Sequence, residues 1–124
     1  MATIKSFTSL EQSRKLAEIL PLESADMHYG EYCAGGEDYP IPNCDDDYNG
    51  HCCWSLAALQ GVLPDEITDD VDVYRNMFFH LKGKYIIQYS RLTTLWPSLL
   101  SVEADNPVDA CYEMILKLHK QNLI

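Results

Sequence analysis

Positive charge is missing from the middle of this 124-residue chain. No Lys or Arg stands between Lys15 and Arg75, and residues 16–74, which are 59 positions, hold 14 of the 19 Asp and Glu residues. The remainder has five acids and nine bases, so the two parts carry −14 and +4 and sum to −10. Such a field repels phosphate backbones, so we expect no direct nucleic-acid binding, and it attracts basic protein surfaces or divalent cations. The alternative is a solvated acidic face that only keeps the protein in solution.

Several other sequence features are also missing. No apolar run reaches the roughly 18 residues that span a bilayer, so we expect no membrane association. "MATIKSFTSLEQ" lacks a basic region followed by an apolar stretch, which argues against a signal peptide and for a cytoplasmic protein. Five cysteines in a reducing compartment argue against a disulfide framework. Nucleotide-binding loops, Gly-x-Ser-x-Gly and His-Glu-x-x-His are missing as well, and no motif indicates an enzyme class.

Length and composition indicate one globular domain over residues 1–124, with 47% hydrophobic and 23% charged residues. A helix is predicted at Ser9–Ile19, where Thr8 and Glu11 form a capping box and Pro21 ends the run. A second helix is predicted at Trp54–Leu63, and so much apolar surface on a short helix indicates a buried element.

The remaining elements include strands. "MHYGEYC" and "DYPIPN" are candidates for short strands, while "PDEITDDVDV" is expected to be a polar connection. Lys82-Gly83 between two β-rich runs predicts a hairpin of residues 76–81 and 84–89, although a helix over Val71–Leu81 fits the apolar spacing too. "TTLWPSLLSVEAD" is a candidate third strand, before or after Pro97.

The last helix is predicted at Pro107–Gln121, after a cap at Asp105 or Asn106. Its core stripe consists of Val108, Cys111, Tyr112, Ile115 and Leu118. The predicted fold class is therefore α+β, with three helices packed on a small antiparallel β-sheet.

The densest chemistry lies in "NCDDDYNGHCCWSL", residues 43–56. Four thiolate or imidazole ligands hold a tetrahedral zinc ion, and the candidate ligands are Cys33, Cys44, His51, Cys52 and Cys53. Against zinc, no Cys-x-x-Cys is present, and adjacent cysteines rarely point at one metal. No other cofactor is expected.

Calcium, a reactive thiol and a purely structural role are the alternatives for this stretch. Asp45-x-Asp47-x-Asn49-Gly50 matches the first half of an EF-hand loop, but Leu56 stands where the bidentate Glu is needed. A thiolate at Cys53 would gain from the following helix N-terminus and from His51 as a base, although the nearby aspartates oppose it. In the structural interpretation, turn-forming residues lead into buried cysteines, and Cys111 is interpreted the same way.

A small-molecule pocket lined by Trp54, Tyr85 and Tyr89 ranks behind these alternatives, because aromatic residues more often form the core.

Three blocks of the chain carry a family likeness. "FTSLEQSRKLAEILPLESADMHY", "CWSLAALQGVLP" and "NPVDACYEMILKLHKQNLI" resemble, in this order, small uncharacterised proteins common in gut anaerobic bacteria, their prophages and other mobile elements. The resemblance covers most of the chain and implies a phage or mobile-element accessory protein in the host cytoplasm. It brings no activity, cofactor or catalytic residue, and the cysteine-rich insert departs from it.

Charge and resemblance together predict a non-catalytic accessory protein. It binds a partner protein through its own acidic surface, and the partner carries the basic groups. The candidate partner-binding residues are Glu37, Asp38, Asp45, Asp46 and Asp47. The alternative function is a zinc-binding protein, with or without enzymatic activity, that uses the cysteine and histidine cluster of residues 33–53.

Overall fold

The computed structural model describes residues 5–31, 38–42, 52–69, 71–91 and 99–124. Its helices are α1 (Leu10–Ala17), the short 3-10 helix η1 (Leu22–Ser24), α2 (Leu56–Val62) and α3 (Pro107–Lys120). Its strands are β1 (Met27–Glu31), β2 (Asp38–Pro42), β3 (Cys52–Cys53), β4 (Glu66–Thr68), β5 (Val73–Leu81), β6 (Lys84–Arg91) and β7 (Leu100–Ala104).

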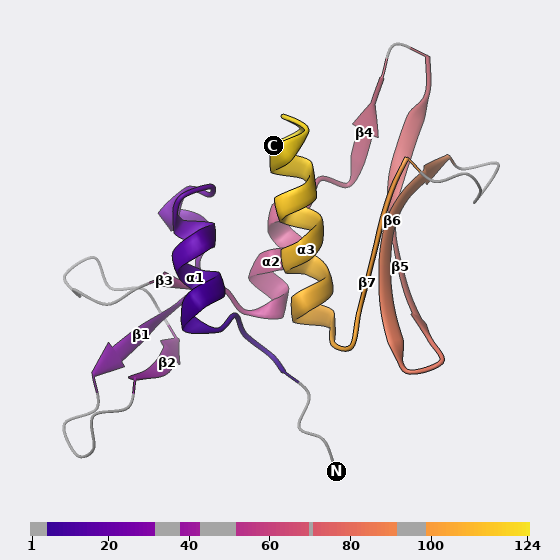
Figure 1. Ribbon diagram of the computed structural model, residues 1–124. Coiled ribbons are helices and arrows are strands. Elements are labelled where there is room, and N and C mark those ends of the chain that lie inside the picture. Colours follow the sequence, from indigo (N-terminus) through magenta and orange to yellow (C-terminus); the bar gives the residue numbers. More distant parts are fainter. Residues whose placement is uncertain (1–4, 32–37, 43–51, 70, 92–98) are drawn as a thin grey trace.

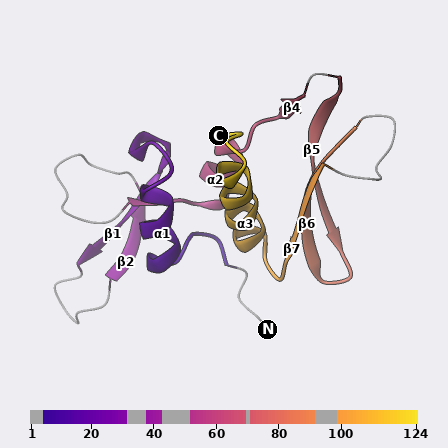
Figure 2. The same cartoon turned by 45° about the horizontal axis from the view of Figure 1, so that its top comes forward.

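The α+β class is confirmed, but the strands form two antiparallel sheets instead of one. The small sheet has the order β2-β1-β3, and the larger has the order β4-β5-β6-β7. In Figures 1 and 2, α2 and α3 stand between the four-stranded sheet and the part of the chain that holds α1 and the small sheet. α3 packs on β6 and β7, α2 packs on α3, and α1 contacts β3.

One hydrophobic cluster joins these elements. Leu16 of α1, Leu59 of α2, Ile87 of β6 and Ile115 of α3 all belong to it and are fully buried. On α3 the predicted stripe is buried except Tyr112, which is half-buried against the core. Burial of this shared apolar surface, at roughly 25 cal/mol per Å², is the main term that holds the larger sheet and the three α-helices together, and Cys52 of β3 packs against it from the small sheet.

The hairpin prediction is confirmed, and the rival helix over Val71–Leu81 is wrong. β5 and β6 pair in register from Tyr74↔Arg91 to Leu81↔Lys84. Lys82 and Gly83 have φ of 53° and 76°, which are the two left-handed positions of a two-residue type I′ turn. The strand predicted near Pro97 is β7, which follows that proline.

Two other local predictions need correction. The segment expected to be a polar connection contains β4, because Ile67 is buried opposite Tyr74 of β5. The capping box of α1 is Ser9 with Gln12: Ser9 Oγ accepts from Gln12 N at 3.2 Å, and Gln12 Oε1 accepts from Ser9 N at 3.0 Å. Thr8, the residue predicted to cap this helix, is instead fully buried.

No helix within the described ranges is both long enough and apolar enough to cross a membrane.

Candidate functional site

The predicted zinc ligands fall partly outside the described residues. Cys33, Cys44 and His51 lie there, as do Asp45 and the rest of the half EF-hand loop. Cys52 and Cys53 form β3, which pairs with β1 through His28↔Cys52 and Met27↔Cys53. Successive side chains of a strand point to opposite faces, so the two thiols do not converge. The part of the chain that the structure describes contains no group of three His, Cys, Asp or Glu side chains placed to hold a metal.

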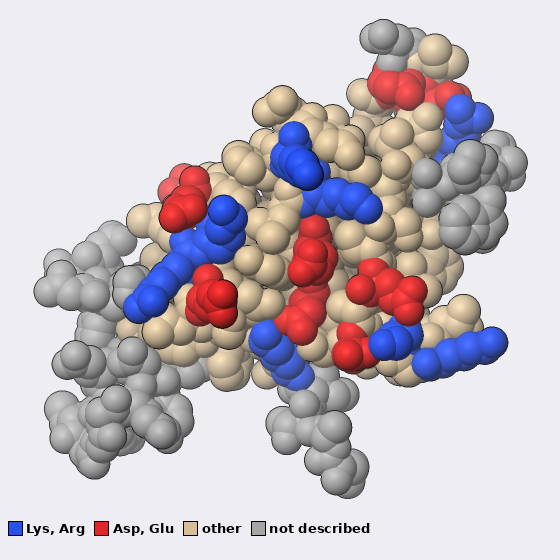
Figure 3. All heavy atoms as spheres, in the orientation of Figure 1, with Lys and Arg blue, Asp and Glu red and all other residues tan. Residues whose placement is uncertain are grey.

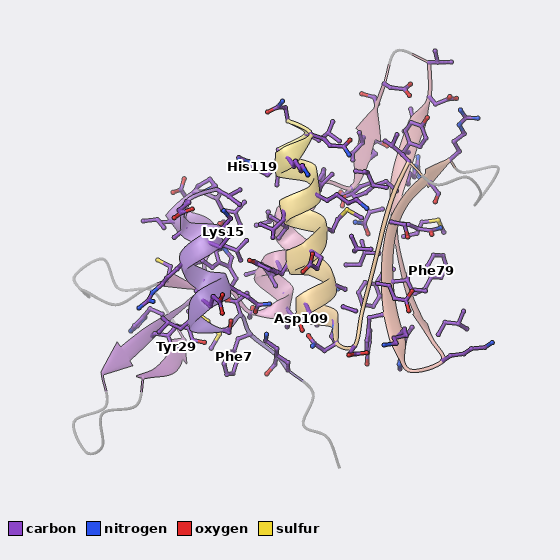
Figure 4. The ribbon with its side chains drawn as sticks, in the orientation of Figure 1. Phe7, Lys15, Tyr29, Phe79, Asp109 and His119 are labelled. Carbon is purple, nitrogen blue, oxygen red and sulfur yellow. The ribbon has the colours of Figure 1, made fainter. Side chains whose placement is uncertain are left out.

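The Cys53 thiol belongs to a buried polar cluster around Thr8. Cys53 Sγ lies 3.6 Å from Thr8 Oγ1 and donates to Thr8 O at 3.5 Å, while Tyr29 Oη donates to the same carbonyl at 2.6 Å. Thr8 Oγ1 also lies 2.8 Å from Ser13 Oγ and accepts from Trp54 N at 3.1 Å. Figure 4 shows Tyr29 of β1 below α1, where this cluster joins the small sheet to the helix.

The geometry of this cluster argues against a nucleophilic thiol. Cys53 precedes the N-terminus of α2 as predicted, but it lies in β3, two residues before the helix cap at Ser55. Burial raises the pKa of the Cys53 thiol despite hydrogen bonds from Thr8, Ser13 and Tyr29 that lower it. Burial likewise raises the pKa of Cys111 to about 12. Both thiols are fully buried, so at neutral pH they remain protonated core groups.

The predicted aromatic pocket is core. Trp54 and Tyr89 are fully buried, and Tyr89 Oη donates to Pro64 O at 2.8 Å. Tyr85 is half-buried and stacks on His80 with ring centroids 4.2 Å apart. These rings therefore fill space between elements and do not enclose a ligand.

The acidic stretch meets cations at its two ends. Lys15 Nζ lies 3.8 Å from Glu18, Arg75 Nε lies 3.8 Å from Glu66, and Arg91 lies 2.7 Å from Asp72. The expected surface is therefore not free of cations at these ends. Figure 3 agrees for the face it shows, where Lys and Arg lie among Asp and Glu over α1, α3 and the larger sheet.

Carboxylates from the interior of the stretch are placed differently. Glu23, Asp26 and Asp65 are exposed and form no ion pair with any described Lys or Arg. Asp26 is held in position because it accepts hydrogen bonds from Ser55 N, at 2.9 Å, and from Ser55 Oγ. The side chains of Glu37, Asp38, Asp45, Asp46 and Asp47 lie outside the described part, and the backbone of Asp38 begins β2.

Two of these carboxylates border an apolar groove beside α2. The groove has a volume of about 720 Å³. One wall consists of residues between Ile19 and Asp26, and the other consists of Ala57, Ala58, Gly61 and Val62. Ile124, which is 40% exposed, adds to the lining. The volume falls in the range of roughly 300–1,000 Å³ that is typical of binding sites in proteins.

The prediction that α2 is a buried element therefore holds for one side of the helix only. Leu59 and Leu63 face the core, but Ala57 and Gly61 are exposed and Val62 is half-buried. Small residues on this side leave the hollow that forms the groove. The sequence "LAALQGV" contains a signal for the groove, because its Ala and Gly residues lie on one side of the helix. The same signal also suits close packing of that side against the core.

No family model, no curated protein and no solved structure matches this chain.

Proposed function

We propose that this chain is a non-catalytic accessory protein that binds another protein through the acidic surface of residues 16–74. The resemblance of its three sequence blocks supports a place among phage or mobile-element accessory proteins in a bacterial cytoplasm. The expected partner carries basic groups where it meets the acidic surface, and it is not itself a nucleic acid.

One observation carries this proposal: among the described residues, several exposed carboxylates of the acidic stretch have no cation beside them. Every ion pair to the stretch within the described residues involves Glu18, Glu66 or Asp72, whereas Glu23, Asp26 and Asp65 have none. Exposed charges of one sign in this interior repel each other. A basic partner relieves that repulsion, which favours association.

The two fully buried thiols support a binding role over nucleophilic catalysis. A nucleophile requires a partly exposed thiol with a lowered pKa, and both Cys53 and Cys111 show the reverse. Among described titratable groups, Asp109 makes a multiple contact with Lys5, Gln12 and Asn106. That contact links the N-terminal segment and α1 to the first turn of α3, as Figure 4 indicates for Asp109, so it serves the fold.

A pair of matched triple variants tests the proposal. In the first, Asp45, Asp46 and Asp47 become Asn, and in the second Glu11, Glu103 and Glu113 become Gln, so both change the net charge by the same amount. Wild-type protein is used to capture partners from a host-type lysate at low and at high salt. Salt above about 0.5 M reduces the Debye length to a few ångströms, so the retained partner should be released there.

We expect the second triple variant to retain the partner at low salt and the first to lose it. Equal loss from both variants would mean that only total charge matters, and retention that ignores salt would overturn the electrostatic proposal.

A further inference from the structure

The lining of the groove beside α2 restricts what can occupy it. Its walls are mainly aliphatic, and Glu23 and Asp26 are the charged groups among its described lining residues. An anionic ligand such as a fatty acid would meet two carboxylates and no described Lys or Arg there. The occupant therefore combines apolar surface with positive charge.

The backbone at the groove favours a helical occupant. On the η1 wall, Ser24 N donates to Pro21 O at 3.0 Å and Ala25 N donates to Leu22 O at 3.1 Å. In α2, the backbone N–H and C=O groups likewise form hydrogen bonds within the helix. An extended peptide would find few free backbone partners on these walls, whereas a helix brings its hydrogen bonds with it.

The small residues of α2 suit a close helix–helix contact. The Ala57, Ala58 and Gly61 side presents little side-chain bulk, and a Cβ built on Gly61 meets no atom within 4 Å. The axes of two packed helices lie roughly 8–10 Å apart, and small side chains at the contact permit the shorter distances. α2 has seven residues, about 10 Å of axis, so two turns of a partner helix match its length.

From these observations we propose that the groove binds an amphipathic helix of a partner protein, with Lys or Arg beside its apolar face. The apolar side chains enter between η1 and α2, and the basic side chains meet Glu23 and Asp26. The hydrogen bonds from Ser55 fix the position of the Asp26 carboxylate, so little of its freedom is lost on binding. This inference rests on the protein-binding function proposed above and assigns one element of the partner.

The test uses a phage-displayed library of random 16-residue peptides. Peptides are selected on the wild-type chain and counter-selected on Gly61→Leu, in which the new side chain occupies the groove. Because the position is open and helical, replacing glycine there should preserve folding and should not lower Tm. Ala57→Arg, at an exposed position on the same side, is the second blocking variant, and Lys120→Leu on α3 is the control for an added leucine.

Selected peptides should carry apolar residues at helical spacing i, i+3 or i+4, and i+7, with Lys or Arg next to them. Fluorescence anisotropy of one labelled selected peptide should show binding about tenfold weaker or more to Gly61→Leu. Glu23→Gln should weaken it about two- to fivefold at low salt, and Glu113→Gln on α3 should leave it unchanged.

Other results would overturn the inference. These are equal affinity for wild type and both blocking variants, an acidic or uncharged consensus, a library that yields no groove-dependent peptide, or a dimer in sedimentation that Gly61→Leu dissociates. If Gly61→Leu still retains the lysate partner while the Asp45, Asp46 and Asp47 variant loses it, the groove inference fails and the proposed function survives.

Discussion

Thr8→Val is the sharpest test of the buried polar cluster. Valine keeps the volume and the branched shape of threonine but removes the hydroxyl group. Thr8 Oγ1 accepts from Trp54 N at 3.1 Å and lies 2.8 Å from Ser13 Oγ, and no atom of Thr8 is exposed to solvent. The substitution therefore leaves the Trp54 N–H without its acceptor and removes one hydrogen-bond partner of the Ser13 hydroxyl.

The expected cost follows from those two groups. An unsatisfied buried donor costs about 1–3 kcal/mol, and the Ser13 hydroxyl recovers part of this because it also lies within hydrogen-bond reach of Cys53. We therefore expect Thr8→Val to lower the free energy of unfolding by about 2–4 kcal/mol. Thr8→Ser keeps the hydroxyl and loses one methyl group, so it should cost about 1 kcal/mol.

Urea unfolding measures both variants, with tryptophan fluorescence and far-UV circular dichroism as independent probes. Equal m-values would show that the shift in midpoint reports native-state stability. The reasoning is refuted if Thr8→Ser is more destabilising than Thr8→Val, because packing and not hydrogen bonding would then govern this position.

Three further predictions concern other parts of the fold. In the hairpin, Lys82→Asn should stabilise the fold by up to about 1 kcal/mol and Gly83→Ala should destabilise it by a similar amount, because both positions have positive φ. Thermal unfolding that shows the opposite signs would contradict this prediction. Burial raises the pKa of Asp109, but hydrogen bonds from Lys5, Gln12 and Asn106 outweigh it and leave that pKa below its usual value. Asp109 should therefore stabilise the fold above about pH 4, and this contribution should disappear as the pH falls through the lowered pKa. Asp109→Asn should flatten the plot of unfolding free energy against pH in that range. Parallel plots for the two proteins would contradict this prediction. Cys53 and Cys111 should resist iodoacetamide at pH 8 in the native protein and react with it after unfolding. Mass spectrometry of the digested peptides measures this labelling. Rapid labelling of either thiol in the native protein would contradict their assignment as core groups.

Local signals predicted the elements that depend on neighbouring residues. Lys82-Gly83 determined the hairpin, because its two-residue turn has few alternatives. Asn106 and Pro107 determined the start of α3, where Asn106 Oδ1 accepts from Asp109 N at 2.8 Å. The division of the strands into two sheets was not predictable, because it depends on pairings between segments distant in sequence.

The candidate site was harder to predict for the same reason. Thr8 and Ser9 both precede an apolar run, and only the packing of Cys53 and Trp54 against Thr8 leaves the cap to Ser9. The open side of α2 likewise depends on where η1 lies, and the sequence near α2 does not specify that. Ion pairs across strands, such as Arg75 with Glu66, reduced the charge asymmetry that is plain along the chain.

The most direct measurement is carbodiimide cross-linking of the captured complex, followed by mass spectrometry. This reagent joins carboxylates to lysines only where they touch, so it identifies which acids meet the partner. Our account predicts cross-links from partner lysines to carboxylates in the interior of the acidic stretch, including Glu23 and Asp45, Asp46 or Asp47. Cross-links confined to Glu11, Glu103 and Glu113 would contradict it, because the partner would then sit on α1, α3 and β7.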